Sequence, residues 1–463
     1  MAKCRRCGGT RVVDVQIETI ETTSLGNRGY LVHDGSFAVA IDVQRDYTRW
    51  TDRAKELGVT LTHVFETHMH NDYVTGGYQL AAADDNIEYV VPANSHATFS
   101  ARFITDGETI TSGNLSITAI HTPGHTEHHT SYHVSDSNTH ALFSGGGLLF
   151  GTVGRTDLVT SDLTRLLTEQ QYESAQKLLS LVPEQASIMP THGFGSFCSS
   201  SDGSGATEST LAEEQSSNIA YTSSKEDFIS TIIGGLGPYP RYYAHMGPAN
   251  QAGPAVVKDL HVHEYSTDAI RQHLHAENSW VIDIRSRTAY AAGHPERAVG
   301  IELGQSFATY TGWLIPWSDS LLLVGDDSEE LQFAYTELSR IGMEQFVAGA
   351  TDSMDAYQAS GATISHDIKT FDDYMAERPA TLIDVRLLTD WQKEHVEGSL
   401  SLPLHELMER ANELPEGPIW VHCASGYRAS IACSLIARSG KQPVLVNDAF
   451  MHAQELHLTT KGE

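Results

Sequence analysis

The feature that most constrains the fold is the histidine-rich stretch Glu66-Thr67-His68-Met69-His70-Asn71-Asp72, which directly follows the apolar run Leu61 to Phe65. In an extended segment, successive side chains point to opposite faces, so His68 and His70 point the same way and can reach one metal ion. Asp72 follows where the chain turns toward a pair of glycines. The pattern therefore predicts a metal cradle at the end of a strand.

The partners of this pattern lie far along the chain. His125 stands in Thr-Pro-Gly-His-Thr and His192 in Pro-Thr-His-Gly, each after an apolar run typical of a strand. Strand and helix patterns alternate between them, and helical spacing is clear over residues 162–181. Because the histidines all follow strands, separated loops can converge on one rim. The candidate metal ligands are His68, His70, His125, Asp72 and His192.

In this chain order the motifs resemble those of the metallo-β-lactamase fold superfamily, over residues 14–250. The segment Phe143 to Leu158, which contains Gly-Arg-Thr-Asp, looks most like the persulfide dioxygenase branch. The resemblance implies an α/β protein whose N-terminal domain, residues 12–254, is an αββα sandwich that follows an extension of residues 1–11.

Two positions depart from the superfamily pattern. Tyr73 stands where the motif has a histidine, and Gly146 stands where it has a bridging aspartate. The resemblance implies that only the first of two usual metal sites is complete, namely the set of His68, His70 and His125. The dioxygenases hold Fe(II) on two histidines and one carboxylate, and here that carboxylate is missing unless Asp72 replaces it. We expect one metal ion, Fe(II) or Zn(II), and expect Gly146→Asp to tighten iron binding.

Length and composition set further bounds. A chain of 463 residues is too long for one core and suggests three domains. The formal net charge of -29 disfavours nucleic acid and anionic membranes as partners, because both would repel the protein. No apolar stretch approaches the about 18 residues of a membrane span. The sequence Met-Ala-Lys-Cys at the N-terminus shows no apolar signal region, so we expect a cytoplasmic protein.

The five cysteines are too few for a disulfide framework and are interpreted singly. Cys4 and Cys7 form half of a zinc pattern without a second half, so an incidental extension is the simpler interpretation. Cys198 follows His192 closely and either faces the metal cavity, as a thiol that holds substrate sulfur, or merely lines a loop. Cys433 falls in an apolar helical run and is expected to be a core thiol.

Two similar units make up the C-terminal part. Trp-Val-Ile-Asp-Ile-Arg over 280–285 matches Thr-Leu-Ile-Asp-Val-Arg over 381–386, and a histidine follows each segment. Strand and helix patterns alternate in both units, which predicts two small α/β domains with parallel sheets, residues 260–360 and 365–463. The sequences resemble rhodanese domains.

The second unit carries a loop suited to nucleophilic chemistry. The apolar strand Ile419 to Val421 is followed by His422-Cys423-Ala424-Ser425-Gly426-Tyr427-Arg428 and by a helix predicted over 429–438. A cysteine at a helix N-terminus, among backbone N–H groups and beside an arginine, is in a setting that favours the reactive thiolate. Cys423 is the predicted nucleophile, and Gly426 and Arg428 complete its loop.

Loop length selects the chemistry. Cysteine phosphatases resemble this unit but use a loop one residue longer, Cys-x5-Arg, around a tetrahedral phosphate, whereas Cys423-x4-Arg428 resembles the cradle of sulfurtransferases. The first unit continues its equivalent strand with Gly325-Asp326-Asp327 and offers no cysteine there. Acidic side chains would repel an anionic sulfur species, so residues 260–360 are expected to be an inactive rhodanese-like domain.

Together these features predict a sulfur-metabolism enzyme that combines a Cys423 sulfurtransferase with a metal-dependent domain acting on low-molecular-weight persulfides. Its expected partners are small persulfide, thiol or thiosulfate substrates, and a homo-oligomer is left open. Two alternatives remain for the metal domain. One is a zinc hydrolase of the thioesterase or glyoxalase II type, in which the metal activates water. The other is a non-catalytic scaffold attached to a rhodanese.

Overall fold

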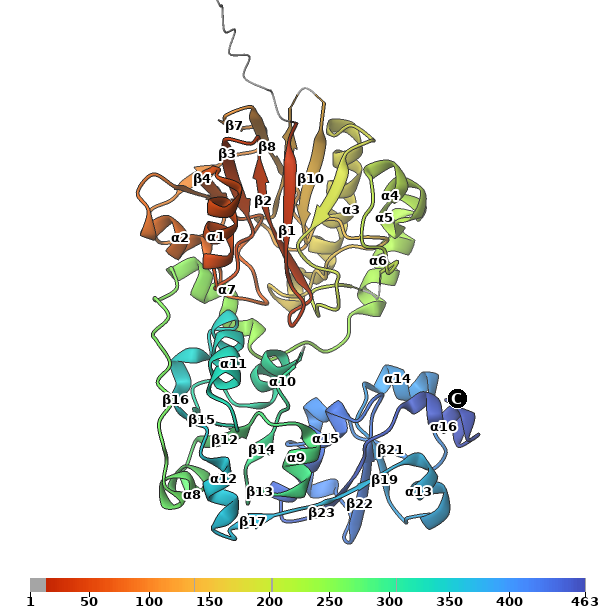
Figure 1. The fold of residues 1–463 in the computed structure, drawn as a ribbon. Helices are drawn as coiled ribbons and strands as arrows, with labels where there is room; N and C mark the ends of the chain where they lie inside the picture. The colour runs from red at the N-terminus through yellow and green to blue at the C-terminus, as the bar shows by residue number, and fades with distance from the viewer. Residues whose placement is uncertain (1–13, 137, 201–202, 305, 463) are drawn as a thin grey trace, which may run out of the picture. The chain divides into compact units, whose positions relative to one another are not determined.

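The computed structural model describes residues 14–136, 138–200, 203–304 and 306–462, so Cys4 and Cys7 lie outside the described residues. The chain divides into two compact units (Figure 1). One unit is Met1–Val256 with Arg340–Gly342, and the other is Val257–Ser339 with Met343–Glu463. Among the described residues, no helix combines the length and the apolar character that a membrane crossing requires.

Two sheets form the centre of the N-terminal unit. The first has the order β1-β2-β3-β4-β5-β6, antiparallel over its first three strands and parallel from β3 to β6. Its strands are β1 (Gln16–Thr22), β2 (Asn27–His33), β3 (Phe37–Ile41), β4 (Thr60–Phe65), β5 (Glu88–Pro92) and β6 (Arg102–Ile104). The helices α1 (Thr48–Leu57) and α2 (Gly77–Ala83) connect its parallel strands.

The second sheet has the order β11-β10-β9-β8-β7 and is antiparallel except for the pair β10 and β11. Its strands are β7 (Thr109–Ser112), β8 (Leu115–His121), β9 (Thr130–Ser135), β10 (His140–Gly145) and β11 (Ser187–Pro190). The helices that follow β10 are α3 (Thr164–Leu181), α4 (Leu211–Ser217), α5 (Ile219–Thr222), α6 (Lys225–Gly235) and α7 (Tyr243–Ala252). The long helix predicted from residue 162 begins as a 3-10 turn, and its α-helical part starts at Thr164.

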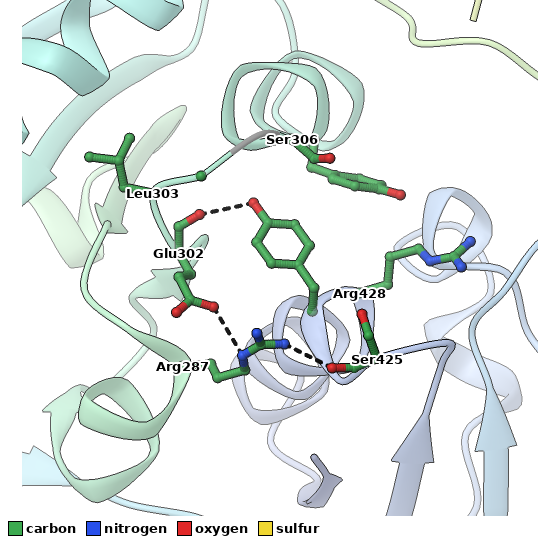
Figure 2. A pocket seen from close by; sticks show the side chains of 9 residues that line it. Arg287, Glu302, Leu303, Ser306, Ser425 and Arg428 are labelled. Carbon is green, nitrogen blue, oxygen red and sulfur yellow. Dashed lines mark hydrogen bonds and ion pairs between the residues drawn. The ribbon is translucent and has the colours of Figure 1, made fainter. Parts of the chain in front are cut away.

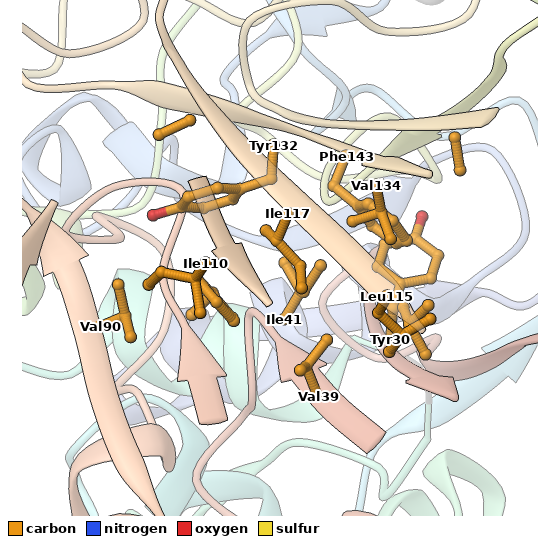
Figure 3. Packing of buried hydrophobic residues seen from close by; sticks show 14 of the residues in the cluster. Tyr30, Val39, Ile41, Val90, Ile110, Leu115, Ile117, Tyr132, Val134 and Phe143 are labelled. Atoms are coloured by element: carbon orange, nitrogen blue, oxygen red, sulfur yellow. The ribbon is translucent and has the colours of Figure 1, made fainter. Parts of the chain in front are cut away.

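The main core lies between the two sheets. Val39 and Ile41 of β3 pack there against Ile117 and Phe143 of the second sheet (Figure 3). Ala38 and Ala40, one residue out of phase, face a separate cluster that includes Trp50 of α1. This alternation follows from the period of two along a strand, and burial of each large apolar side chain contributes about 1.5–3 kcal/mol. Helices on the outer faces complete four layers, which confirms the predicted αββα sandwich.

The second unit contains two parallel sheets. One has the order β14-β12-β15-β16, and the other has the order β18-β23-β22-β19-β21. Their strands are β12 (Ser279–Asp283), β14 (Val299–Gly300), β15 (Ser320–Val324), β16 (Val347–Thr351), β18 (Asp367–Lys369), β19 (Leu382–Asp384), β21 (Leu400–Ser401), β22 (Pro418–His422) and β23 (Gln442–Val446). Read from β14 and from β21, the two sheets place corresponding strands in the same order.

Helices and two short antiparallel pairs surround these sheets. The helices are α8 (Thr267–His275), α9 (Arg287–Ala292), α10 (Phe307–Leu314), α11 (Ser328–Arg340), α12 (Met354–Ala359), α13 (Phe371–Glu377), α14 (Leu388–Lys393), α15 (Tyr427–Arg438) and α16 (Phe450–Glu455). The pairs are β13 (His294–Pro295) with β17 (Thr363–Ile364), and β20 (Glu394–Val396) with β24 (Thr459–Lys461).

The two repeats in the sequence make equivalent Asp–Arg contacts in the structure. Arg285 pairs with Asp283 at 2.7 Å in the first half, and Arg386 pairs with Asp384 at 2.7 Å in the second. In each half, the same guanidinium also donates to a backbone carbonyl eight residues further along. Below we call residues 260–360 the first repeat and residues 365–463 the second repeat.

Candidate functional sites

The five predicted metal-ligating side chains converge in the N-terminal unit and are buried. They come from the loops after β4, β8 and β11, which the sandwich brings to one end of its sheets. Among the described residues, three groups of side chains could hold a metal ion, and within each group the ligand atoms lie within 4.8 Å of one another. The groups are His68, His70 and His192; His125, His192 and Cys198; and Asp42, Glu66 and His70.

Hydrogen bonds fix which ring nitrogens face the centre. Nδ1 of His125 contacts the carbonyl oxygen of Arg155 at 2.7 Å, and its Nε2 is buried without a hydrogen-bond partner. Nδ1 of His70 is likewise buried and unpartnered. Unpaired buried polar atoms are uncommon, and imidazoles held on one nitrogen while the other is free are typical of metal ligands. These residues therefore fit a metal ion.

His192 lies at the centre of the cluster. Its Nε2 is 3.4 Å from Nε2 of His68, and it belongs to two of the three groups. Its Nδ1 lies 3.2 Å from Oδ2 of Asp72, which also accepts a hydrogen bond of 2.9 Å from Asn27. Burial opposes the charged carboxylate, but His192 and these hydrogen bonds hold the pKa of Asp72 well below its usual range. The sequence had grouped His192 with the incomplete second site, whereas the geometry places it beside His68 and His70.

Two acidic residues that sequence analysis did not select support His70. Nε2 of His70 lies 3.3 Å from Asp42 and 3.1 Å from Glu66. Burial disfavours the charged imidazolium, but these carboxylates outweigh it and raise the pKa of His70 to about 10. Asp42 also accepts hydrogen bonds from the N–H and the hydroxyl of Thr67. Asp42 directly follows β3, which pairs with the strand that leads into the histidine motif. This position was the signal in the sequence that could have identified Asp42 as a neighbour of the site.

The two departures from the superfamily pattern have structural explanations. The ring of Tyr73 stacks on His70 with centroids 4.2 Å apart. A side chain at Gly146 would meet the imidazole of His125, because its Cβ would lie 2.3 Å from Cδ2 and 2.7 Å from Nε2. The space next to Gly146 is therefore already filled by a candidate ligand.

This crowding argues against the expectation that Gly146→Asp tightens iron binding. We predict that the aspartate displaces His125 from the carbonyl of Arg155, lowers metal occupancy and destabilises the unit by about 1–3 kcal/mol, the usual cost of overpacking. Metal content and thermal unfolding of the variant provide the measurements. Gly234→Asp adds the same charge at an open glycine of the same unit that has no positive φ, and it is the control for occupancy. Higher iron occupancy in Gly146→Asp than in the wild type would contradict this prediction.

Cys198 is fully buried beside His125 and His192. Burial, and then the nearby Asp72 carboxylate, raise the pKa of its thiol well above the usual value. The thiol lies beside the candidate metal ligands, and its role in holding substrate sulfur stays a prediction.

A cleft of about 370 Å³ opens next to the cluster. It is lined by Met69 and Asn71 from the motif and by Tyr239, Tyr243 and other residues of the segment that ends in α7. Asn250 of α7 donates hydrogen bonds of 2.9 Å to the carbonyls of His70 and Tyr73. The segment that ends in α7 therefore belongs to the N-terminal unit and lines the approach to the cluster.

The predicted nucleophile lies in the second repeat between β22 and α15. Cys423 is buried, and the N–H of Gly426 donates to its Sγ at 3.2 Å. Gly426 has a positive φ of 89°, and a Cβ there would lie 2.3 Å from Oδ1 of Asn447, so the position requires glycine. The helix begins at Tyr427, two residues earlier than predicted, because Gly426 itself serves as its N-cap. Arg428 therefore lies in the first turn, with Nη1 at 3.9 Å from Asp390.

Residues of the first repeat hold this loop. Nη1 of Arg287 donates to the carbonyl of Ser425 at 3.1 Å, and its Nε pairs with Glu302 at 3.0 Å (Figure 2). The hydroxyl of Tyr427 donates to the carbonyl of Glu302 at 2.9 Å. These residues, with Arg428, line a cleft of about 500 Å³ that both repeats share. In an acidic chain, this cleft brings two guanidinium groups together.

The first repeat has no cysteine at the corresponding position. After β15, Asp327 accepts hydrogen bonds from the N–H groups of Glu329 and Glu330 at 2.7 and 3.0 Å. Its carboxylate thus occupies the helix N-terminus whose N–H groups would otherwise face a bound anion.

Comparisons with known proteins find relatives of both units. Residues 30–193 match the metallo-beta-lactamase superfamily, and residues 367–453 match the rhodanese-like domain. The persulfide dioxygenase ETHE1, mitochondrial, of Homo sapiens is 31% identical over 216 residues, which are 46% of this chain and 78% of that protein. A hydroxyacylglutathione hydrolase of Pseudoalteromonas translucida is 29% identical over 173 residues, 37% of this chain and 59% of that protein.

Among solved structures, a metallo-beta-lactamase from Staphylococcus aureus subsp. aureus COL superposes with a TM-score of 0.64 at 27% identity. The match covers 73% of this chain and 98% of that chain. The protein therefore belongs to the metallo-β-lactamase superfamily. Its N-terminal unit is homologous to the persulfide dioxygenases and is fused to a C-terminal rhodanese-like domain, which places the protein in sulfur metabolism.

Proposed function

We propose that the protein is a sulfurtransferase in which Cys423 carries sulfane sulfur. The observation that carries this proposal is the Gly426 N–H directed at Cys423 Sγ in a Cys-x4-Arg loop. The thiolate attacks the outer sulfur of a donor, a new S–S bond forms, and the donor leaves as a thiol or, from thiosulfate, as sulfite. An acceptor thiolate then attacks the outer sulfur of the Cys423 persulfide, which restores the Cys423 thiolate. Arg428 and the loop N–H groups stabilise the persulfide charge.

For the N-terminal unit we propose oxidation of a low-molecular-weight persulfide. One persulfide, one O₂ and one water give one thiol and one sulfite. The support is the homology to persulfide dioxygenases and the cluster of imidazoles around His192. When bound in such a site, iron supplies coordination positions for activating O₂. The cleft lined by Tyr239 and Tyr243 would hold the organic part of the substrate.

The first repeat, residues 260–360, is proposed to be an inactive rhodanese-like domain. Its strand order and its Asp283–Arg285 pair match those of the second repeat, and Asp327 caps the helix where a nucleophilic loop would lie. Its contribution to sulfur transfer would be the contact of Arg287 with the loop of Cys423.

This contact leads to a prediction for Arg287→Ala. Loss of the guanidinium leaves the Ser425 carbonyl and Glu302 without their partner, so the loop is less well ordered. We expect kcat/KM for sulfur transfer to fall at least about 10-fold, because a hydrogen bond to a charged group contributes about 1.5–3 kcal/mol. Arg271→Ala, which removes an exposed arginine of α8 in the same repeat, is the matched control and should change the rate less than twofold. Equal rates for Arg287→Ala and the wild type would show that the contact is dispensable.

The hydrolase alternative is retained for the metal unit, since relatives also include a hydroxyacylglutathione hydrolase. Elemental analysis of untagged protein, together with oxygen uptake and thioester hydrolysis assays, separates the two. Stoichiometric iron with persulfide-dependent oxygen uptake supports oxidation. Zinc with thioester hydrolysis and no oxygen uptake would overturn the oxidation proposal.

A further inference from the structure

The second metal-binding group of the N-terminal unit consists of two histidines and a cysteine. Ligand atoms of His125, His192 and Cys198 lie within 4.8 Å of one another, and all three side chains are fully buried. Nε2 of His125 has no hydrogen-bond partner, because the hydrogen bond to Arg155 uses the other ring nitrogen. A buried imidazole nitrogen left open next to a thiol is an arrangement typical of metal-ligating side chains.

The backbone of Arg155 contacts both His125 and Cys198. The carbonyl of Arg155 holds Nδ1 of His125, and the N–H of Arg155 donates to the carbonyl of Cys198 at 2.8 Å. The Arg155 guanidinium also donates to the carbonyl of Phe197 at 2.9 Å. The N–H of Cys198 is bonded to Ser196 Oγ at 3.1 Å. The backbone of Cys198 is therefore held by a network that also orients a candidate ligand.

The nearby carboxylate of Asp72 lies on the other side of His192 from His68. Its Oδ2 contacts Nδ1 of His192, whereas the nitrogen of His192 near His68 is Nε2. Asp72 is in none of the three groups of mutually close ligand atoms. Its Oδ2 is therefore placed to orient His192 from behind, as carboxylates commonly do for metal-ligating histidines, while its Oδ1 is buried without a hydrogen-bond partner. At Gly146, the imidazole of His125 leaves no room for a carboxylate.

We propose that Cys198 is a metal ligand, together with His125 and His192, and that its thiolate supplies the negative charge that the superfamily takes from the carboxylate at the position of Gly146. The inference rests on the proposal that this unit holds a metal ion. On binding, a metal–sulfur bond forms, the S–H bond breaks, and the proton passes to solvent. A thiolate carries the same charge as the carboxylate that it would replace, and thiolate ligands suit both iron and zinc.

Cobalt substitution tests this inference without an activity assay. The test uses the full chain with the substitutions Cys4→Ser and Cys7→Ser, so that the N-terminal cysteines cannot bind the metal. The metal-free form of this variant is loaded with Co(II). We expect stoichiometric cobalt and an intense near-ultraviolet sulfur-to-cobalt charge-transfer band. Adding Cys198→Ser should remove the band, whereas adding Cys433→Ser, the matched control for a buried thiol, should keep it. X-ray absorption of the zinc form should show one sulfur neighbour at about 2.3 Å.

The possible outcomes distinguish the role of Cys198 from the proposal that this unit holds a metal ion. Full cobalt occupancy without the band, or a band that persists in Cys198→Ser, would overturn the role of Cys198 and leave the metal proposal intact. Failure of the folded protein to bind cobalt would overturn both. If Cys198→Ser does not fold, a variant that keeps Cys198 as its only cysteine decides the question. It should retain the band and the sulfur neighbour, and loss of both at full occupancy would contradict the inference.

Discussion

Cys423→Ser is expected to abolish sulfur transfer from thiosulfate or a persulfide to cyanide or a thiol, with a loss of at least about 10³-fold. A serine hydroxyl is not ionised near neutral pH and cannot store a sulfane sulfur. The N–H of Gly426 that contacts Sγ would then face a group that forms no persulfide. Steady-state assays with both donors, and mass spectrometry of the donor-loaded protein, measure the effect.

Two controls define this result. Cys433→Ser replaces another buried thiol of the same repeat and should retain transfer. Metal content should be unchanged in Cys423→Ser, because the candidate metal ligands belong to the other unit. Residual transfer near the wild-type rate, or an added sulfur mapped outside the second repeat, would refute the assignment of the nucleophile.

Alanine substitutions at His68, His70, His125 and His192 are each expected to lower metal affinity by more than about 100-fold. Loss of a ligand should exceed the 10–100-fold cost of losing a residue that only orients one. His192 is included because its Nε2 lies 3.4 Å from that of His68. Asp72→Ala should lower metal affinity by only about 10–100-fold, since Asp72 contacts the opposite nitrogen of His192. Metal titration of each purified variant, with one ion expected in the wild type, measures these effects.

His133→Ala is the matched control for this series, because His133 is partly buried in β9 and pairs with His140 away from the cluster. Its metal affinity should equal that of the wild type. Two tightly bound ions per chain, or full occupancy in His70→Ala, would refute the single-site proposal and require a different set of ligands.

Much of this arrangement was predictable because it depends on local rules. The period of two along a strand places His68 and His70 on one face, and histidines that follow strands meet at one end of the sheets. The repeat with Asp283–Arg285 and Asp384–Arg386 predicted two parallel sheets, since a strand followed by a helix packs in only a few ways. The loop of Cys423 was recognised because its glycine and arginine lie at fixed short spacings.

Other features were decided by the tertiary structure. Distances between side chains from different loops depend on how the sheets pack, and no short spacing encodes them. For this reason the place of His192, the support of His70 by Asp42 and Glu66, and the position of Cys198 emerged only in three dimensions.

Gly146 shows the difference most clearly. The sequence determined that a carboxylate is absent there, and the natural inference was that restoring it would improve the site. The packed structure decided otherwise, because the ring of His125 already fills the volume that any side chain at Gly146 would need. Excluded volume arises from neighbours that are distant in the sequence, so the residue type alone determined what was missing, and only packing determined whether it could be replaced.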